Sequence, residues 1–438
     1  MIDVHAHVVL DGVLGCAGAY GPDLDTGPDG RPRFRVGNYE LHGVRYRESA
    51  FMDVDRRLTA IDRLGIDIQI LSPNPLTYFH HIEAPIATGF CQWHNESLAR
   101  VVGQRPDRFR GFAQLPMQDV DAAVIELRRA VGDLGLVGAY IGTDFGLTFD
   151  DERLDPLYAA FVELDVPMFI HPAPAGIDGP LHDLRIRRFD LDLSLGFLYE
   201  ETLAVACIVY GEVLNRHSGL DICVSHGGGA ATLMEGRLAH AGRSRPWAQP
   251  DGVDFGAGLR KLWFDNHVHD DAGLAFVEAK VGVERLVIGT NLAGWDTPTT
   301  PAELHHRPEY DGAARRLLRL NRDRPAEPVL TVTRHLACVA RRDPAAMAAD
   351  YADDAVLSRG ADEYRGRDAI ERYFSAVPGR LAGRDLRFEP PVVDGSAIVV
   401  RWVIGDDAAG SGATGTDRYI IDGNRIVGQT VELDGDDF

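Results

Sequence analysis

Between Ile2 and Trp295 the chain alternates eight short apolar runs with amphipathic stretches, and this alternation limits the possible folds more than any other feature. The runs have the length of strands and are rich in β-branched residues, whereas the stretches between them repeat apolar residues with helical spacing. The expected strands are Ile2–His7, Asp67–Leu71, Arg110–Gln114, Gly138–Ile141, Met168–His171, Ile222–Ser225, Leu262–Phe264 and Leu286–Ile288. The expected helices include Val54–Leu64, Asp121–Gly132, Leu154–Leu164 and Ala272–Val281.

Strands that alternate with helices predict an α/β fold in which helices cover a parallel sheet. Eight strands are the number that closes a barrel, and about 290 residues suit a barrel with loop insertions. We therefore predict a (β/α)8 TIM barrel. The competing fold is an open doubly wound sheet, but no Gly-x-Gly-x-x-Gly turn follows the first strand to support it.

Histidines lie at the expected carboxyl ends of these strands, where barrels of this kind carry their chemistry. His5 and His7 alternate on the first strand, so both side chains project from one face. His171 ends the fifth strand. Three neutral imidazoles, one oxygen ligand and an open position describe a catalytic zinc site. Further polar and ionisable residues follow the seventh strand at Asp265–Asp270 and the eighth at Asn291–Asp296.

His226 ends the sixth strand and is followed by three glycines, Gly227 to Gly229. Glycines at this place let the backbone approach a substrate and open a helix N-terminus, which favours an anion. We predict that His226 is the general acid or base, because its side chain titrates near neutral pH. The alternative is that His226 is a fourth imidazole ligand of the metal.

The pattern changes after residue 300. Residues 301–328 have the composition of a linker, and a second unit follows at residues 329–438. In that unit three expected helices, Thr331–Arg342, Pro344–Tyr351 and Arg367–Val377, precede strands that close the chain. Helices followed by a curved antiparallel sheet predict a small α+β domain. The expected organisation is therefore a barrel over residues 1–300, a linker and the C-terminal domain.

Composition limits the partners and the compartment. The 45 Lys and Arg against 66 Asp and Glu give a formal net charge of −21, which disfavours nucleic acid and anionic membranes. The five cysteines are scattered, without a Cys-x-x-Cys pair, as is typical of a reducing compartment. No basic and apolar leader is visible, and we expect no stretch with the length of a spanning helix. We expect a cytoplasmic protein without nucleic-acid or membrane partners.

Several motifs resemble one known family. Asp3-Val4-His5-Ala6-His7, Phe169-Ile170-His171-Pro172, Val224-Ser225-His226-Gly227-Gly228-Gly229-Ala230 and Val268-His269-Asp270 are similar to motifs of amidohydrolase-related metal enzymes of the aminocarboxymuconate-semialdehyde decarboxylase type. The resemblance covers roughly residues 1–296. It implies a (β/α)8 barrel, a divalent metal and nonoxidative loss of CO2 from an unsaturated acid. It also implies that His5, His7 and His171 bind the metal and that His226 handles the proton.

The resemblance extends to two arginines. Arg45 aligns with an arginine that binds the substrate carboxylate, and Arg245 matches one that reaches across a dimer interface. Bidentate guanidinium binding explains arginine in such positions. Solvated surface arginines are the alternative reading. The resemblance further implies a homodimer or a larger homo-oligomer.

One position departs from the family pattern. The family ends the eighth strand with Gly-Thr-Asp or Gly-Ser-Asp, whose carboxylate binds the metal, whereas this chain has Asn291 there. Asn291 supplies only a neutral carbonyl oxygen as a metal ligand and cannot act as a base. Asp296, five residues later, is the alternative ligand or catalytic carboxylate. Loss of the carboxylate would leave a more positive metal and a more acidic bound water.

The C-terminal unit resembles the SnoaL-like, ketosteroid-isomerase-like fold, a cone-shaped α+β domain. The resemblance rests on Tyr351-Ala352-Asp353-Asp354-Ala355 and Tyr364-Arg365-Gly366-Arg367-Asp368-Ala369-Ile370. Members of that group include cyclases, isomerases, hydratases and noncatalytic modules. The sequence therefore leaves open whether this domain carries a second catalytic step.

The function expected from these features is decarboxylation of a small unsaturated or aromatic carboxylic acid. The expected cofactor is Zn2+, with Mn2+ or another divalent metal as the alternative. A metal-dependent hydrolase or hydratase that acts on a lactone or a ring-cleavage product is the nearest rival. One further hypothesis is a bifunctional enzyme with a cyclase or isomerase step in the second domain. Another is a barrel that has lost its chemistry, as Asn291 would indicate, and serves as a binding scaffold while the C-terminal domain binds a ligand or partner.

Overall fold

The computed structural model describes residues 1–438 except 175–176, 178–183, 249–251, 321–326, 341, 382–383, 406–412, 424 and 435–438. The chain forms two compact units. The first comprises residues 1–98, 107–131 and 136–322, and the second comprises residues 99–106, 132–135 and 323–438.

The first unit contains the predicted barrel. Its eight strands are β1 (Ile2–Val8), β5 (Ile68–Pro73), β6 (Phe109–Gly111), β7 (Ala139–Ile141), β8 (Met168–Ile170), β9 (Ile222–Val224), β10 (Trp263–Asp265) and β11 (Leu286–Leu292). They are parallel and neighbour one another in chain order, with β1 between β11 and β5. The Val137 N–H donates to Gly111 O (2.9 Å), and the Ala113 N–H donates to Gly138 O (2.8 Å). These bonds join β6 to β7, so the sheet closes as predicted.

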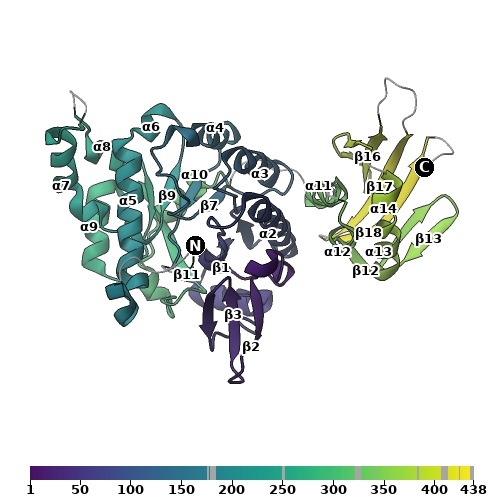
Figure 1. Cartoon of the computed structure of the whole chain (residues 1–438), viewed down its shortest axis with the longest axis horizontal. Coiled ribbons are helices and arrows are strands. Elements are labelled where there is room, and N and C mark those ends of the chain that lie inside the picture. The colour runs from purple at the N-terminus through teal and green to yellow at the C-terminus, as the bar shows by residue number, and fades with distance from the viewer. Residues whose placement is uncertain are drawn as a thin grey trace. The chain divides into compact units, whose positions relative to one another are not determined.

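Helices surround these strands (Figure 1). They are α1 (Val54–Leu64), α2 (Ala84–Gln104), α3 (Val120–Gly132), α4 (Asp155–Leu164), α5 (Phe197–Tyr210), α6 (Val213–Arg216), α7 (Ala231–Ser244), α8 (Phe255–Leu259), α9 (Asp271–Val281) and α10 (Pro308–Leu317). Local sequence sets their ends. The Asp53 side chain accepts a hydrogen bond from the Arg56 N–H and begins α1, and Gly65 ends it in the left-handed conformation.

Helix α10 lies within residues 301–328, where the sequence predicts a linker. Its buried residues repeat with helical spacing: Tyr310, Ala313, Ala314 and Leu317. Three of them, Ala313, Ala314 and Leu317, belong to the same hydrophobic core as Ile2 and Val4 of β1. The helix is therefore part of the barrel unit, which extends to Arg322. Residues 321–326 of the expected linker lie outside the described residues.

Two features of the barrel unit are not expected from the sequence. An antiparallel sheet of β2 (Asp23–Thr26), β3 (Pro32–Val36) and β4 (Tyr39–His42) is inserted between β1 and α1 and projects from the barrel (Figure 1). In addition, Asp192–Tyr210 is long and apolar enough to span a membrane by length and composition alone, contrary to the expectation of no such stretch. This stretch includes α5, which carries the fully buried Glu201 of the site described below.

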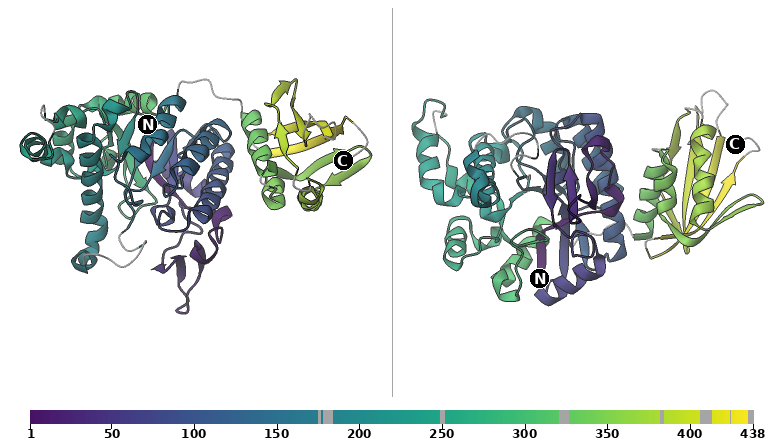
Figure 2. Two further views of the ribbon diagram at one scale, coloured as in Figure 1. Left: turned by 45° about the horizontal axis from the view of Figure 1, so that its top comes forward. Right: turned by 60° about the horizontal axis from the view of Figure 1, so that its bottom comes forward.

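The second unit has the predicted α+β composition. Its helices are α11 (Glu327–Ala340), α12 (Pro344–Ala349), α13 (Arg367–Ser375) and α14 (Val377–Leu381). Its strands are β12 (Tyr351–Arg359), β13 (Asp362–Arg365), β14 (Leu386–Phe388), β15 (Val392–Asp394), β16 (Ala397–Ile404), β17 (Ala413–Asp422) and β18 (Arg425–Leu433). The sheet order is β13-β12-β18-β17-β16-β14, and the β12 and β18 pair is parallel. Helices lie against one side of this curved sheet (Figure 2).

Candidate active site

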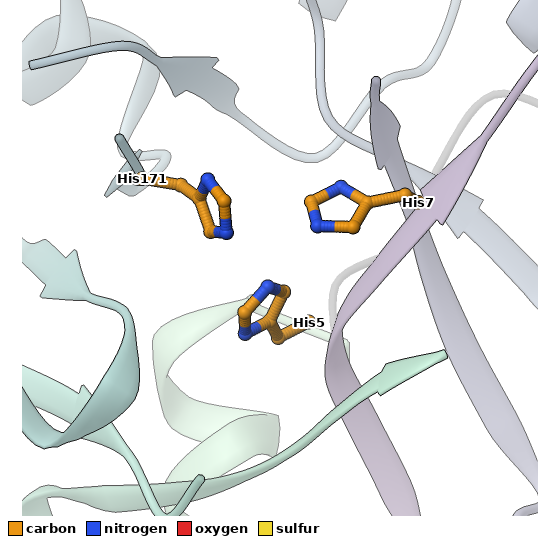
Figure 3. Close-up of side chains that lie close together, drawn as sticks. All are labelled: His5, His7 and His171. Atoms are coloured by element: carbon orange, nitrogen blue, oxygen red, sulfur yellow. The ribbon is translucent and has the colours of Figure 1, made fainter. Parts of the chain in front are cut away.

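Three histidines predicted as metal ligands converge inside the barrel. His5 and His7 lie on β1, and His171 directly follows β8. One ring nitrogen from each lies within 4.8 Å of the others. The ring centroids are 5.2 Å apart for His5 and His7, 4.9 Å for His5 and His171, and 4.8 Å for His7 and His171. Figure 3 shows the rings facing one another. We call these three residues the first triad.

Hydrogen bonds fix the tautomers of the first triad. The Nδ1–H of His5 donates to Asp265 Oδ2 (2.7 Å), that of His7 to Pro73 O (3.2 Å), and that of His171 to Pro172 O (2.7 Å). Each Nε2 therefore carries a lone pair. The Nε2 atoms of His5 and His171 are buried, and neither has a hydrogen-bond partner among the described residues. A divalent cation satisfies such an arrangement, so the donor set fits a metal.

Burial also keeps the first triad neutral. Burial lowers the pKa of His7 to about 4, and it lowers the pKa values of His5 and His171 well below the usual histidine value. The neighbouring imidazoles lower the pKa values of His5 and His171 further. Only a neutral imidazole offers a lone pair to a metal, so these rings can bind one at neutral pH.

Asp265 at the end of β10 holds the first triad in place. Besides accepting from His5, its carboxylate accepts the backbone N–H groups of Gly227 (3.1 Å) and His267 (3.2 Å) at Oδ1. It is completely buried. A carboxylate that accepts from the far nitrogen of a metal-binding histidine fixes the ring and raises its basicity. The sequence places Asp265 among the ionisable residues that follow the seventh strand and does not reveal this role.

Asp3 of the Asp3-Val4-His5-Ala6-His7 motif has a structural role. Its Oδ2 accepts hydrogen bonds from Gln69 Nε2 (2.7 Å) and Thr290 Oγ1 (2.7 Å). Its Oδ1 accepts the His5 N–H (3.2 Å). These bonds connect β1 with β5 and β11, and so they fix the strand that presents two of the histidines.

His226 lies beside the first triad, with its ring centroid 5.2 Å from that of His5 and 5.1 Å from that of His171. Its Nδ1–H donates to Glu201 Oε1 at 2.6 Å, and the Ser225 hydroxyl donates to the same oxygen. Burial alone would lower the pKa of His226, but the Glu201 carboxylate outweighs burial and raises the pKa to about 9. His226 is therefore held as a charged proton donor.

The glycines after His226 permit this close packing. A Cβ at Gly229 would lie 2.3 Å from Leu198 O on α5, and the residue has a φ of +63°. Only glycine fits a backbone that combines such a conformation with such a contact. The loop therefore packs tightly against α5, the helix that carries Glu201. Sequence reasoning misses Glu201, because its partner is 25 residues away in the chain.

Asn291 and Asp296 occupy different places. Asn291 Oδ1 is buried without a hydrogen-bond partner in the described part of the chain, and the Asn291 side chain interacts with His7. Its Nδ2 donates to Asp296 Oδ1 at 2.6 Å. Asp296 lies against His267 (3.0 Å) and His269 (2.9 Å). Asp296 therefore belongs to a second cluster. It does not join the first triad, although the sequence offers it as an alternative ligand of that metal.

The two predicted arginines belong to neither cluster of histidines. Arg45 follows β4 and Arg245 follows α7, and both side chains are exposed. Within the described residues, no contact joins either of them to the histidines. Their predicted roles in substrate binding stay predictions.

The barrel unit contains a cavity of about 1010 Å3. Residues from the loops after β5, β7 and β8 and from α5 line it, including Tyr78, His80, Phe145, Ala173 and Leu203. The Tyr78 hydroxyl lies 3.5 Å from His171 Nδ1, so the wall of the cavity reaches the first triad. Aromatic and aliphatic side chains make this wall suitable for a flat organic ligand.

Residues 2–322 match the family model described as amidohydrolase, and residues 332–429 match the model of the SnoaL-like domain. The chain belongs to the amidohydrolase family. This amidohydrolase is 32% identical over 257 residues to the 2-amino-3-carboxymuconate-6-semialdehyde decarboxylase of Dictyostelium discoideum, a match that covers 57% of this chain and 70% of the relative. It is 34% identical to the gamma-resorcylate decarboxylase of Rhodococcus jostii, over 44% of this chain and 62% of the relative.

The amidohydrolase also resembles a solved structure. The dihydroxybenzoic acid decarboxylase of Polaromonas, determined with bound manganese and the inhibitor 2-nitroresorcinol, superposes with a TM-score of 0.57 at 23% identity. The superposition covers 74% of this chain and 97% of that protein. This likeness confirms the predicted barrel fold.

Proposed function

We propose that this amidohydrolase is a metal-dependent nonoxidative decarboxylase of a small aromatic or unsaturated carboxylic acid. The observation that carries the proposal is the pairing of a metal-competent histidine triad with a neighbouring His226 that is hydrogen-bonded to the buried Glu201. The relatives described above are decarboxylases by name, which supports the same reaction.

His5, His7 and His171 would hold the metal. A divalent cation bound there supplies Lewis-acid polarisation of a substrate oxygen. Imidazole ligands suit both zinc and manganese. We favour Zn2+ because three histidines with a neutral fourth donor match its catalytic sites, and the manganese in the Polaromonas enzyme makes Mn2+ the alternative.

His226 would transfer the proton. Its Nδ1 is engaged by Glu201, so Nε2 is the nitrogen that delivers the proton to the substrate carbon that bears the carboxylate. The bond between that carbon and the carboxylate then breaks, and CO2 leaves. The new C–H bond is made with a π electron pair of the substrate, the electron pair of the broken C–C bond restores that π system, and His226 becomes neutral. Such proton transfer typically contributes 10²- to 10⁴-fold to a rate.

Arg45 and Arg245 would hold carboxylates, Arg245 from a partner subunit. Exposed large apolar side chains support a homodimer, because Trp247, two residues after Arg245, is 53% exposed and Leu233 at the start of α7 is 74% exposed. Mixing His226→Asn with Arg245→Ala protein tests this arrangement. Mixed dimers should recover activity that neither variant shows alone, and a monomeric mass in solution would contradict it.

The reaction is tested with the full chain on gamma-resorcylate, other hydroxybenzoates and unsaturated dicarboxylates. CO2 release and incorporation of oxygen from labelled water are measured together. We expect CO2 release without label uptake, and at least a 100-fold loss of rate in His226→Asn with unchanged metal content. Label uptake without CO2 would instead identify a hydratase or hydrolase and overturn the proposal.

A further inference from the structure

A second group of metal-binding side chains lies beside the first triad. The ring nitrogens of His267 and His269 and a carboxylate oxygen of Asp296 all lie within 4.8 Å of one another. Asp296 Oδ2 is 3.0 Å from His267 Nε2 and 2.9 Å from His269 Nε2. We call these three residues the second triad. The proposed reaction assigns them no role.

The hydrogen bonds of His267 leave one nitrogen available. His267 is 6% exposed, and its Nδ1 lies 3.2 Å from Gly289 O. Because a carbonyl oxygen only accepts, Nδ1 carries the proton. Nε2 then has a lone pair, and it is buried without a hydrogen-bond partner among the described residues.

This lone pair faces an anion. Asp296 Oδ2 lies 3.0 Å from His267 Nε2. Two electron pairs at this separation repel each other unless a positive charge lies between them. A second proton on His267 would provide that charge, and so would a metal cation.

The donor set favours the metal. Two imidazoles and one carboxylate are common ligands of zinc and of other divalent transition metals. Ligand bonds of about 2.1 Å place tetrahedral donors roughly 3.4 Å apart, so the two distances from Asp296 Oδ2 to the histidine nitrogens need to lengthen by only a few tenths of an ångström. The His269 side chain is 52% exposed, which leaves a path for the ion and room for water ligands.

Asn291 contacts both triads. Its side chain interacts with His7 of the first triad, and its Nδ2 donates to Asp296 Oδ1 at 2.6 Å. The amide thus occupies one oxygen of Asp296 and leaves Oδ2 to the histidines. The rings of His5 and His267 are 6.0 Å apart, so the two groups are neighbours with separate donor atoms.

We propose that the second triad binds its own divalent cation, of the zinc or manganese class, next to the cation of the first triad. The chain therefore holds two ions when it is fully loaded. A carboxylate ligand gives the second site a negative charge that the three neutral imidazoles of the first triad lack. This proposal does not depend on the reaction that the enzyme catalyses.

The test counts metal ions per chain. Full-length protein is stripped with a chelator and equilibrated by dialysis against Mn2+, and in a parallel experiment against Zn2+, and the bound metal is quantified. His269→Ala removes one ligand of the second triad at an exposed side chain, where folding tolerates the change. His171→Ala removes one ligand of the first triad. His306→Ala is the matched control, because His306 lies 3.0 Å from Asp311 in a separate His–Asp pair.

We expect two ions per chain in the wild type and in His306→Ala, and one ion in each of the two triad variants. His269→Ala should keep the affinity of its remaining ion within about threefold of the wild type. One ion per chain in the wild type, or two in His269→Ala, would contradict a cation held by the second triad. Wild-type protein that binds two ions but releases no CO2 would reject the proposed reaction and still support the second metal site.

Discussion

The side-chain amide of Asn291 donates a hydrogen bond of 2.6 Å to Oδ1 of Asp296. A carboxylate at position 291, as in the family pattern, would place two anions in contact at this point. The amide instead satisfies Asp296 and keeps its own oxygen buried and unpartnered within the described residues. The departure from the family pattern thus has a structural reason: it accommodates a second carboxylate near the metal site.

Asn291→Asp should therefore destabilise the metal-free protein by about 1–3 kcal/mol, because two buried like charges come into contact. With Mn2+ added, the rise in melting temperature should exceed that of the wild type, because the new carboxylate is a stronger ligand. Thermal unfolding with and without metal measures both effects. Asn215→Asp is the control, since Asn215 donates to Glu212 at 2.9 Å on the exposed surface. An unchanged metal response would contradict the assignment of Asn291 to the site.

Glu201→Gln should reduce kcat by about 100-fold, because a neutral amide no longer stabilises charged His226. Metal content should stay unchanged, since Glu201 contacts His226 and Ser225 but none of the first triad. Steady-state kinetics with metal analysis separates the two effects. Glu163→Gln on the barrel surface is the control, with a side chain 63% exposed. A wild-type kcat in Glu201→Gln would contradict the assignment of His226, held by Glu201, as the proton donor.

Asp265→Asn should weaken metal binding by about 10- to 100-fold. The Gly227 and His267 N–H groups require an oxygen at Oδ1, so the new amide nitrogen faces His5 Nδ1. His5 must then move its proton to Nε2, which removes the lone pair from the first triad. Titration of the metal-free variant with Mn2+ gives the dissociation constant. Equal affinities in the variant and the wild type would show that Asp265 does not set the tautomer.

Acid should destabilise the second unit through Asp350. Burial raises the pKa of this carboxyl, but the charge of Arg334 at 2.9 Å helps lower it to about 2. A lowered folded-state pKa contributes stability above the unfolded value near 4, and this stability is lost as the pH falls from about 4 to about 2. The contribution at neutral pH is ~2 kcal/mol.

Asp350→Asn should accordingly lower the urea midpoint of the second unit at pH 7 and flatten its dependence on pH between 4 and 2. Hydrogen-exchange labelling of peptides from β12 and β18 during urea unfolding follows this unit in the full chain. Asp394→Asn is the control, since Asp394 pairs with Arg418 at the exposed surface. An equally steep loss of stability in Asp350→Asn would assign the acid sensitivity to other groups.

The sequence predicts the barrel and the first triad because both depend on local patterns. Strand periodicity places His5 and His7 on one face, and the parallel order of strands brings His171 to the same end. Helix α10 carries the same kind of signal in Tyr310, Ala313 and Leu317, but prolines and arginines around it resemble a linker.

Long-range partners are the part that local patterns do not reveal. Glu201 reaches His226 from helix α5, and the apolar sequence around Glu201 is typical of an ordinary core helix. The position of Asp296 depends on a turn in which Asn291 has a φ of +47°. Nothing in the local sequence predicts that this turn directs the carboxylate to His267 rather than to His171.

CO2 release by stripped and reloaded enzyme tests the central claim most directly. We expect no CO2 release by the metal-free full chain and recovery of release when Mn2+ or Zn2+ is added back. His171→Ala should stay inactive after the same addition. Release that persists at the wild-type rate without metal, or in His171→Ala, would contradict a catalytic metal held by the first triad.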